Sequence, residues 1–133
     1  MALDGIFEQF PGLRGGCIEQ GALWVVDLLR RLDIAQSTFQ KTEPALRLPM
    51  KPSEYLRRQV KFTPFPTEPV GWMIEQAGPE LFCFSSDYPH PEGGRDPLGR
   101  FEASLDGLDD TVKTRFYSTN YAEMMGPVLS ARV

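Results

Sequence analysis

The sequence predicts an α/β fold in which short parallel strands alternate with helices. Three apolar, strand-like runs carry this prediction, at residues 13–19, 59–63 and 81–86, and helical stretches separate them. Their spacing of roughly 25 to 45 residues leaves room for one crossover helix between successive strands, as in the βα units of a parallel sheet.

The helices are predicted from apolar spacing and from the residues that begin and end helices. Residues 23–32 have the strongest amphipathic pattern, and this helix can run on toward Gln40. Asp4 and Ser53 are the predicted N-caps of two shorter helices, and Gly78-Pro79 closes a third. The predicted shorter helices cover residues 4–10, 53–58, 70–77, 97–105, 109–117 and 120–125, and residues 128–133 are predicted to be a frayed tail.

Length and composition predict one domain of a soluble protein. A chain of 133 residues with 41% hydrophobic and 24% charged residues can build a single core. A net charge of −4 without a basic block argues against nucleic acid as a partner, and no apolar run is long enough for a membrane span. Cys17 and Cys83 lie in apolar runs, which predicts reduced core cysteines and a cytoplasmic location, and the first residues show no signal-peptide pattern.

The run at residues 81–86 ends in the most chemically distinctive part of the chain. Its short length, its aromatic residues and the prolines after it favour a buried strand over a buried helix. Asp87 and His90, the single histidine, follow directly. At a strand end such side chains can form an active-site mouth, but the same residues also occur in ordinary turns, and the spacing alone leaves both interpretations open.

One face of the predicted sheet has no obvious cover. Right-handed crossovers place the helices of three parallel strands on a single face, yet parallel sheets are buried on both faces. We therefore expect the C-terminal helices to fold across the second face, or another chain to cover it, or this sequence to be part of a larger fold. Self-association or a partner chain is the predicted consequence if the face stays open.

Six local strings resemble, in order and spacing, the C-terminal part of the amidohydrolase-related family of metal-dependent hydrolases and decarboxylases. They are Gly5-Ile-Phe-Glu-Gln-Phe-Pro-Gly-Leu13, Ile18-Glu-Gln-Gly-Ala-Leu-Trp24, Leu29-Arg-Arg-Leu-Asp33, Pro52-Ser-Glu-Tyr-Leu-Arg-Arg-Gln59, Ser86-Asp-Tyr-Pro-His90 and Asn120-Tyr-Ala122. The resemblance implies a (β/α)₈ barrel, of which residues 1–133 would form one partial domain with the last three strands and their helices. A whole barrel takes about 250 residues, so the chain would be roughly half of one.

The resemblance also implies a divalent metal, zinc or alternatively manganese, at the C-terminal mouth of the barrel. Asp87 matches the aspartate that ends the last strand of the family, where it binds the metal and accepts a proton. The histidine ligands of the family precede the region that this chain covers. The resemblance therefore implies a metal-dependent hydrolase or decarboxylase of a small molecule, and it predicts that the isolated chain is inactive.

Three further residues are expected to line the substrate pocket: Glu19, Trp24 and His90. Glu19 stands where the family often has a catalytic histidine, and its negative charge argues against a carboxylate substrate and so against decarboxylation. Trp24 could instead anchor a helix to the barrel. A nucleophilic serine has no support, because no Gly-x-Ser-x-Gly elbow surrounds Ser85 or Ser86. The alternative function is an inactive remnant, or a subunit of a split barrel that acts through protein–protein contacts.

Overall fold

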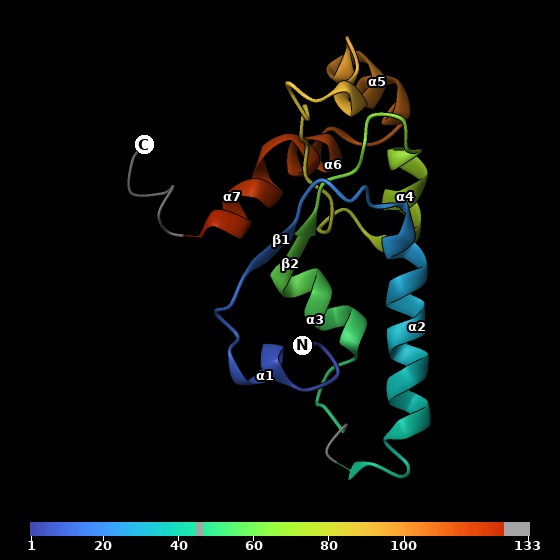
Figure 1. Cartoon of the computed structure of the whole chain (residues 1–133), viewed down its shortest axis with the longest axis vertical. Coiled ribbons are helices and arrows are strands. Elements are labelled where there is room, and N and C mark those ends of the chain that lie inside the picture. Colours follow the sequence, from blue (N-terminus) through green and yellow to red (C-terminus); the bar gives the residue numbers. More distant parts are fainter. Residues whose placement is uncertain (45–46, 127–133) are drawn as a thin grey trace.

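The computed structural model of the chain describes residues 1–44 and 47–126, and Figure 1 shows its helices gathered around a small parallel sheet. The sheet has two strands, β1 (Gly15–Cys17) and β2 (Val60–Phe62). The helices are α1 (Ile6–Gln9), α2 (Leu23–Phe39), α3 (Pro52–Gln59), α4 (Val70–Ala77), α5 (Pro97–Ser104), α6 (Asp110–Thr114) and α7 (Asn120–Met125). A 3₁₀ turn, η2 (Pro91–Gly93), and a π-helical turn, η3 (Arg115–Thr119), complete the described elements. The tail predicted at residues 128–133 lies outside the described residues.

The two strands are parallel, as predicted, and both are shorter than the apolar runs that contain them. Cys17 lies opposite Phe62 in the register of the sheet. The third predicted strand joins the sheet only through a single parallel bridge between Phe62 and Phe82. In this bridge the Phe62 amide donates to Leu81 O over 2.8 Å, and the Cys83 amide donates to Phe62 O over 2.9 Å. The described residues therefore contain two βα units and a bridge, where the sequence predicts three βα units.

The third segment leaves the sheet because its next amide bonds to a helix. Phe84 N donates to Phe116 O over 2.9 Å, and Phe116 belongs to the π-helical turn η3. In an α-helix the amide of Asn120 would donate to Phe116 O, four residues back. In this π-helical turn it donates to Arg115 O, five residues back, so Phe116 O can accept from Phe84 instead. The predicted strand at residues 81–86 is therefore wrong beyond Cys83, because a tertiary contact replaces the strand pairing.

One face of the sheet packs against α2 and α4. Side chains alternate between faces along a strand, so Phe62 and Lys61 point to opposite sides. The Phe62 ring meets the edge of Trp24 at the start of α2, with ring centroids 5.6 Å apart. The core on this side is completed by buried apolar side chains of the helices and the bridge segment, among them Val25, Leu29, Met73, Ile74 and Phe82.

The opposite face of the sheet is partly covered by α7, on the left of the strands in Figure 1. The buried Lys61 ammonium donates to Glu123 Oε2 of α7 over 3.1 Å and to Glu80 O over 2.6 Å. A cavity of about 110 Å³ lies between helix and sheet. Ile18 and Tyr121 line this cavity and remain 54% and 47% exposed. The expectation that C-terminal helices fold across this face is met by α7, and part of the face stays open.

Asn120 fastens the start of α7 to the third segment. Its side chain is fully buried, and its Nδ2 donates to Pro79 O over 2.6 Å and to Phe82 O over 2.8 Å. Because Pro79 and Phe82 flank the point where the chain enters the bridge, one amide group satisfies two backbone carbonyls there. Asn120 therefore has a structural role.

The helix starts show where local patterns were overridden. The helix predicted from Leu23 does run on, as far as Phe39. Ser53 is wrong as an N-cap, since α3 begins at Pro52 after Lys51. The amide and hydroxyl of Ser53 instead donate to the Asp33 carboxylate of α2, over 3.0 and 2.8 Å.

Two other predicted boundaries also move. Asp4 is wrong as the N-cap of the first helix, because Gly5 occupies that position and the Asp4 carboxylate pairs with the amino group of Met1 over 2.9 Å. The helix predicted at residues 109–117 is α6 continued by η3, and the chain then passes directly into α7.

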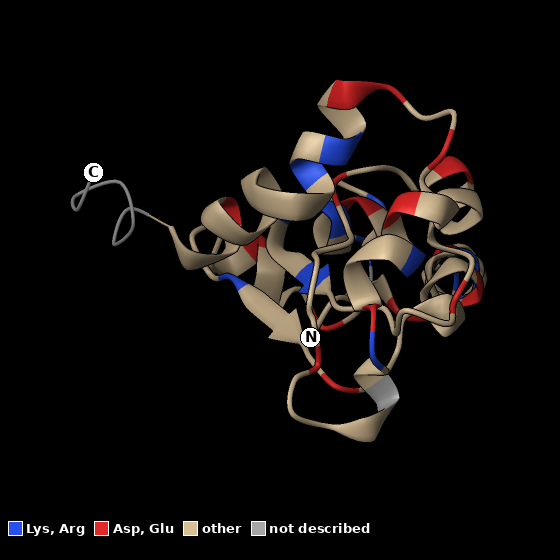
Figure 2. Ribbon diagram, turned by 90° about the horizontal axis from the view of Figure 1, so that it is seen from above, with Lys and Arg blue, Asp and Glu red and all other residues tan. Residues whose placement is uncertain are grey.

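The distribution of the charged residues and the unpaired state of the two cysteines agree with the composition. Along the described residues, Figure 2 shows Lys and Arg interspersed with Asp and Glu. Cys17 and Cys83 are free thiols, and burial raises the pKa of the Cys83 thiol to about 11, which keeps it protonated and unreactive. Among the described residues, no helix has the length and apolar character that crossing a membrane requires.

Removing the Asn120 amide should destabilise the fold. Asn120→Ala leaves the carbonyls of Pro79 and Phe82 without donors in the core, and each buried unsatisfied group costs about 1–3 kcal/mol. We expect urea unfolding, followed by circular dichroism, to show a loss of about 2 kcal/mol or more. Ser118→Ala, an exposed position in the preceding turn, is the control and should change little. An Asn120→Ala protein as stable as the wild type would contradict this role.

The anchor of α7 should also weaken in acid. Burial favours a raised pKa for Glu123, but its hydrogen bonds and ion pairs with Lys61 and Arg115 outweigh burial and lower this pKa. The stabilisation is therefore present above the ordinary pKa of glutamate and is lost as the pH falls through the lowered value. We expect Glu123→Gln to be less stable than wild type at pH 7 and to approach it at pH 3 in urea titrations. The exposed Glu75→Gln serves as control, and a pH-independent difference would contradict the prediction.

Candidate metal-binding site at the strand ends

Three residues that the sequence singled out meet at one edge of the sheet. Because the strands are parallel, the loops after β1, β2 and the bridge segment leave the sheet at the same end, toward α5 in Figure 1. At this end one potential ligand atom each of Glu19, Asp87 and His90 lies within 4.8 Å of the others. Glu19, just after β1, therefore lies close to Asp87 and His90, although these residues are far apart in the sequence.

Glu19 is held in place by the segment that follows β2. Its amide donates to Thr63 Oγ1 over 3.4 Å, and the Thr63 amide donates to Cys17 O over 3.1 Å. These two bonds continue the pairing of β1 and β2 past the last strand residue. The side chain of Glu19 is exposed at the edge of the sheet.

Asp87 and His90 are placed by a compact loop. The His90 amide donates to Asp87 O over 2.7 Å, and the Asp87 amide donates to Ser85 Oγ over 3.3 Å. A Cβ atom at the buried Gly93 would lie 2.3 Å from Ser86 O, so only glycine lets the loop close on itself here. Ser85 and Ser86 therefore shape the turn, in agreement with the absence of a serine-nucleophile motif.

Glu19 and Asp87 share an unusual backbone conformation. Their φ angles are +61° and +55°, and they are the two residues other than glycine with positive φ in the part of the chain that is described. Such conformations cost free energy for residues with a Cβ atom, and they gather at functional sites. Both carboxylates of the site therefore stand on strained backbone that the neighbouring hydrogen bonds maintain.

The chemistry of these side chains fits a divalent cation. Within residues 1–44 and 47–126, neither the Glu19 nor the Asp87 carboxylate forms an ion pair. Two carboxylates close together repel each other, and a cation between them relieves this repulsion. Carboxylate oxygens and a neutral imidazole nitrogen are ordinary ligands of zinc and manganese, and a modest approach of the three groups would allow one ion to bridge them.

Trp24 makes the contacts of an anchoring residue. Its Nε1 donates to the carbonyls of Gln20 and Gly21 over 3.2 and 3.1 Å, and its ring packs against Phe62. The side chain is still 43% exposed. These contacts match the interpretation that Trp24 ties α2 to the sheet, and its role as a pocket residue stays a prediction.

Glu68 was not identified from the sequence. It lies in the proline-rich loop after β2, and its carboxylate accepts hydrogen bonds from Phe65, Ala22 and Leu23 amides. Two of these residues precede it by 46 and 45 positions, so no local pattern marks the interaction.

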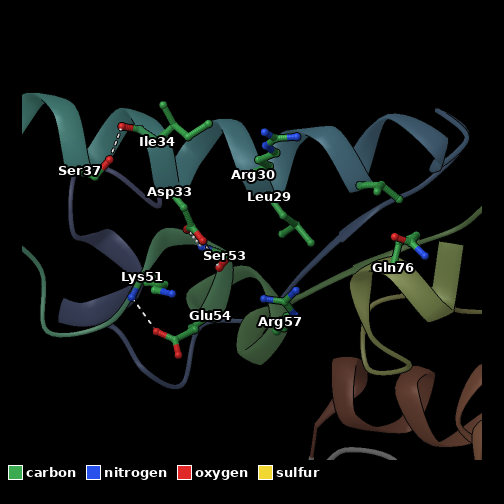
Figure 3. Close-up of a pocket in the computed structure, with 11 residues that line it drawn as sticks. Leu29, Arg30, Asp33, Ile34, Ser37, Lys51, Ser53, Glu54, Arg57 and Gln76 are labelled. Atoms are coloured by element: carbon green, nitrogen blue, oxygen red, sulfur yellow. Dashed lines mark hydrogen bonds between the residues drawn. The ribbon is translucent and has the colours of Figure 1, made fainter.

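A hollow of about 760 Å³ between α2 and α3 has a structural explanation (Figure 3). None of the converging residues lines it. Both carboxylates that line it accept hydrogen bonds: the Asp33 carboxylate accepts from Ser53, and the Glu54 carboxylate accepts from the Lys51 amide over 2.7 Å. The bonds from Ser53 to Asp33 join α3 to α2, and the bond from the Lys51 amide to Glu54 satisfies the start of α3.

The structure of the chain is similar to parts of two larger enzymes. The sequence matches no protein-family model and no curated protein. Its structure matches that of an amidohydrolase from Mycobacterium avium subsp. paratuberculosis K-10, with a TM-score of 0.77 and 29% identity, over 95% of this chain and 31% of the other. It also matches 5-carboxyvanillate decarboxylase from Sphingomonas paucimobilis, with a TM-score of 0.73 and 26% identity, over 93% of this chain and 37% of the other. The chain thus spans about a third of the length of each.

The backbone strain at Asp87 should change the free energy of unfolding of variants at this position. Glycine adopts a positive φ without the steric penalty of a Cβ atom, which is roughly 1–2 kcal/mol. We expect Asp87→Gly to be more stable than Asp87→Ala by about 1 kcal/mol in urea unfolding. At Asp106, an exposed position without positive φ, alanine should be at least as good as glycine. An alanine variant as stable as the glycine variant at position 87 would refute backbone strain there.

Proposed function

We propose that this chain, whose structure resembles part of an amidohydrolase, supplies the last metal ligand and neighbouring pocket residues of a metal-dependent hydrolase acting on a small molecule. In this proposal Asp87 is the metal ligand and the proton acceptor. The chain corresponds to the C-terminal portion of the barrel. The observation that carries the proposal is the convergence of Glu19, Asp87 and His90 at one sheet edge.

Each side chain has a distinct part in the proposed site. One carboxylate oxygen of Asp87 would hold the metal, while the other can take up a proton. Glu19 and His90 are close enough to complete the ligand set or to orient a substrate at the mouth. When bound, a divalent cation supplies Lewis-acid polarisation and makes water more acidic.

Zinc is the proposed ion, with manganese as the alternative. Imidazole suits zinc, whereas carboxylate oxygens also suit manganese, and the set in this chain has two carboxylates and one imidazole. Catalytic zinc usually has three protein ligands and one open position. In a complete barrel, further histidine ligands would come from strands that this chain does not contain, and the isolated chain is expected to be inactive.

The proposed reaction is hydrolysis of a C–N or C–O bond, in preference to C–C cleavage. Glu19 places a negative charge beside the site, and this charge repels a carboxylate substrate. A neutral substrate suffers no such penalty. One of the similar structures is a decarboxylase, so decarboxylation is the competing reaction that a substrate test must include.

A non-catalytic function is the second candidate. The sheet face opposite α2 is only partly covered by α7, and the apolar residues Ile18 and Tyr121 remain exposed there. Such a surface suits a second copy of this chain or a partner chain that completes the barrel. The chain would then act as an inactive remnant or as one subunit of a split barrel.

Metal binding by the whole chain tests the proposal. Metal-free protein titrated with Zn²⁺ or Mn²⁺ in a calorimeter should bind one ion, and Asp87→Asn should weaken binding by tenfold or more, because it removes an anionic ligand. Asp106→Asn, which also removes one exposed carboxylate, is the matched control and should bind like wild type. Circular dichroism must show that both variants are folded.

The outcomes separate the two candidates. Binding that depends on Asp87 supports the metal-dependent enzyme. A folded wild-type protein that binds neither ion, or an Asp87→Asn protein that binds as well as Asp106→Asn, refutes Asp87 as a ligand in this chain and favours the non-catalytic function.

A further inference from the structure

Glu68 links the two loops that flank the candidate site. Its Oε1 accepts from the amides of Ala22 and Leu23 over 3.1 and 2.8 Å. Its Oε2 accepts from Ala22 and from Phe65 over 2.9 and 2.7 Å. One partly buried carboxylate thus collects amides from the loop after β1 and from its own loop after β2.

The position of this carboxylate follows from the start of α2. The first amides of a helix lack partners within the helix, and the helix dipole makes this end partially positive. The N-cap residue of α2 is Ala22, whose side chain cannot accept a hydrogen bond. Glu68, far away in the sequence, provides the missing acceptor and a negative charge at the N-terminus of a 17-residue helix.

Gly21 allows the carboxylate to come this close. Its φ is +60°, and a Cβ atom at this position would lie 2.9 Å from Glu68 Oε1 and 3.0 Å from the Phe65 ring. The loop after β1 therefore packs directly on Glu68 at Gly21, where any larger residue would clash with Glu68 and Phe65.

The same loop carries Glu19 of the site and accepts a hydrogen bond from Trp24 at the start of α2. Glu19 precedes Gly21 by two positions, and the Trp24 indole donates to Gly21 O. The strained φ of Glu19 requires a loop that is fixed on both sides. Thr63 fixes the side next to β1, and Glu68 fixes the side next to α2.

We propose that Glu68 is a positioning residue of the site, which holds the loop after β1 so that the Glu19 carboxylate stays beside Asp87 and His90. This proposal rests on the proposed function for its metal readout. In the described part of the chain, the hydrogen bonds of the Glu68 carboxylate are with the amides of Ala22, Leu23 and Phe65, and none is with a ligand atom of the site. It acts through the backbone of Gly21, Ala22 and Leu23.

A double-variant cycle on the whole chain distinguishes positioning from simple helix capping. Mn²⁺ affinity is measured by electron paramagnetic resonance for wild type, Glu68→Gln, Glu19→Gln and the double variant. We expect Glu68→Gln to weaken Mn²⁺ binding by about tenfold in the wild-type background and by less than twofold in the Glu19→Gln background, because coupled residues are not additive. Glu75→Gln, an exposed glutamate of α4, should leave the affinity unchanged.

A second readout does not depend on metal. The Trp24 indole N–H bonds to the Gln20 and Gly21 carbonyls, so its ¹⁵N–¹H resonance reports the position of the loop. Glu68→Gln should shift this resonance and leave that of the Trp72 indole in place. The shorter Glu68→Asp is the milder variant if Glu68→Gln does not fold.

The two proposals fail in different ways. Wild-type protein that binds neither Zn²⁺ nor Mn²⁺ overturns the proposed function, while the Trp24 resonance still tests the loop. An unmoved Trp24 resonance overturns the positioning role of Glu68. Equal losses of affinity in the two backgrounds overturn it as well, since a general effect on the fold would act independently of Glu19.

Discussion

The backbone of Phe62 joins the three segments on which the site depends. Phe62 lies opposite Cys17 of β1, and its amide and carbonyl bond to Leu81 and Cys83. Because both pairings are parallel, the residues that follow each segment emerge at the same edge. A shift of register by one residue would turn each side chain to the other face and separate the carboxylates. The main role of the short sheet is therefore to bring the loops that carry the site residues to the same edge.

The positive φ angles of Glu19 and Asp87 lower the stability of the fold at the two positions that the proposed function needs. A glycine at either position would suit the backbone better, yet it would remove the charge that the proposed site needs. The hydrogen bond from the Glu19 amide to Thr63 and the closed loop after Asp87 hold these conformations in place. Strain of this kind persists only where the surrounding structure determines it, which is the behaviour expected of a functional site.

Sequence reasoning succeeded where the cause was local. The amphipathic pattern predicted α2, and Gly78-Pro79 predicted the end of α4. It failed where a distant group decided the outcome: Phe116 O captures the Phe84 amide and ends the third strand. Asp87 and His90, whose roles stay predictions, share one short motif and could be singled out from the sequence. Glu68 could not, because its importance arises from amides about 45 residues away.

The pairing of Lys61 with Glu123 has a consequence for how the chain folds. These residues are 62 positions apart, so the cover of the sheet is supplied by α7, the last described helix to be synthesised. Until α7 arrives, the nascent sheet presents a lysine and an apolar face to its surroundings. Long-range contacts form late, and exposed sheet surface at that stage favours aggregation. Lys61 places a charge on this face, which makes the face less apolar until α7 covers it.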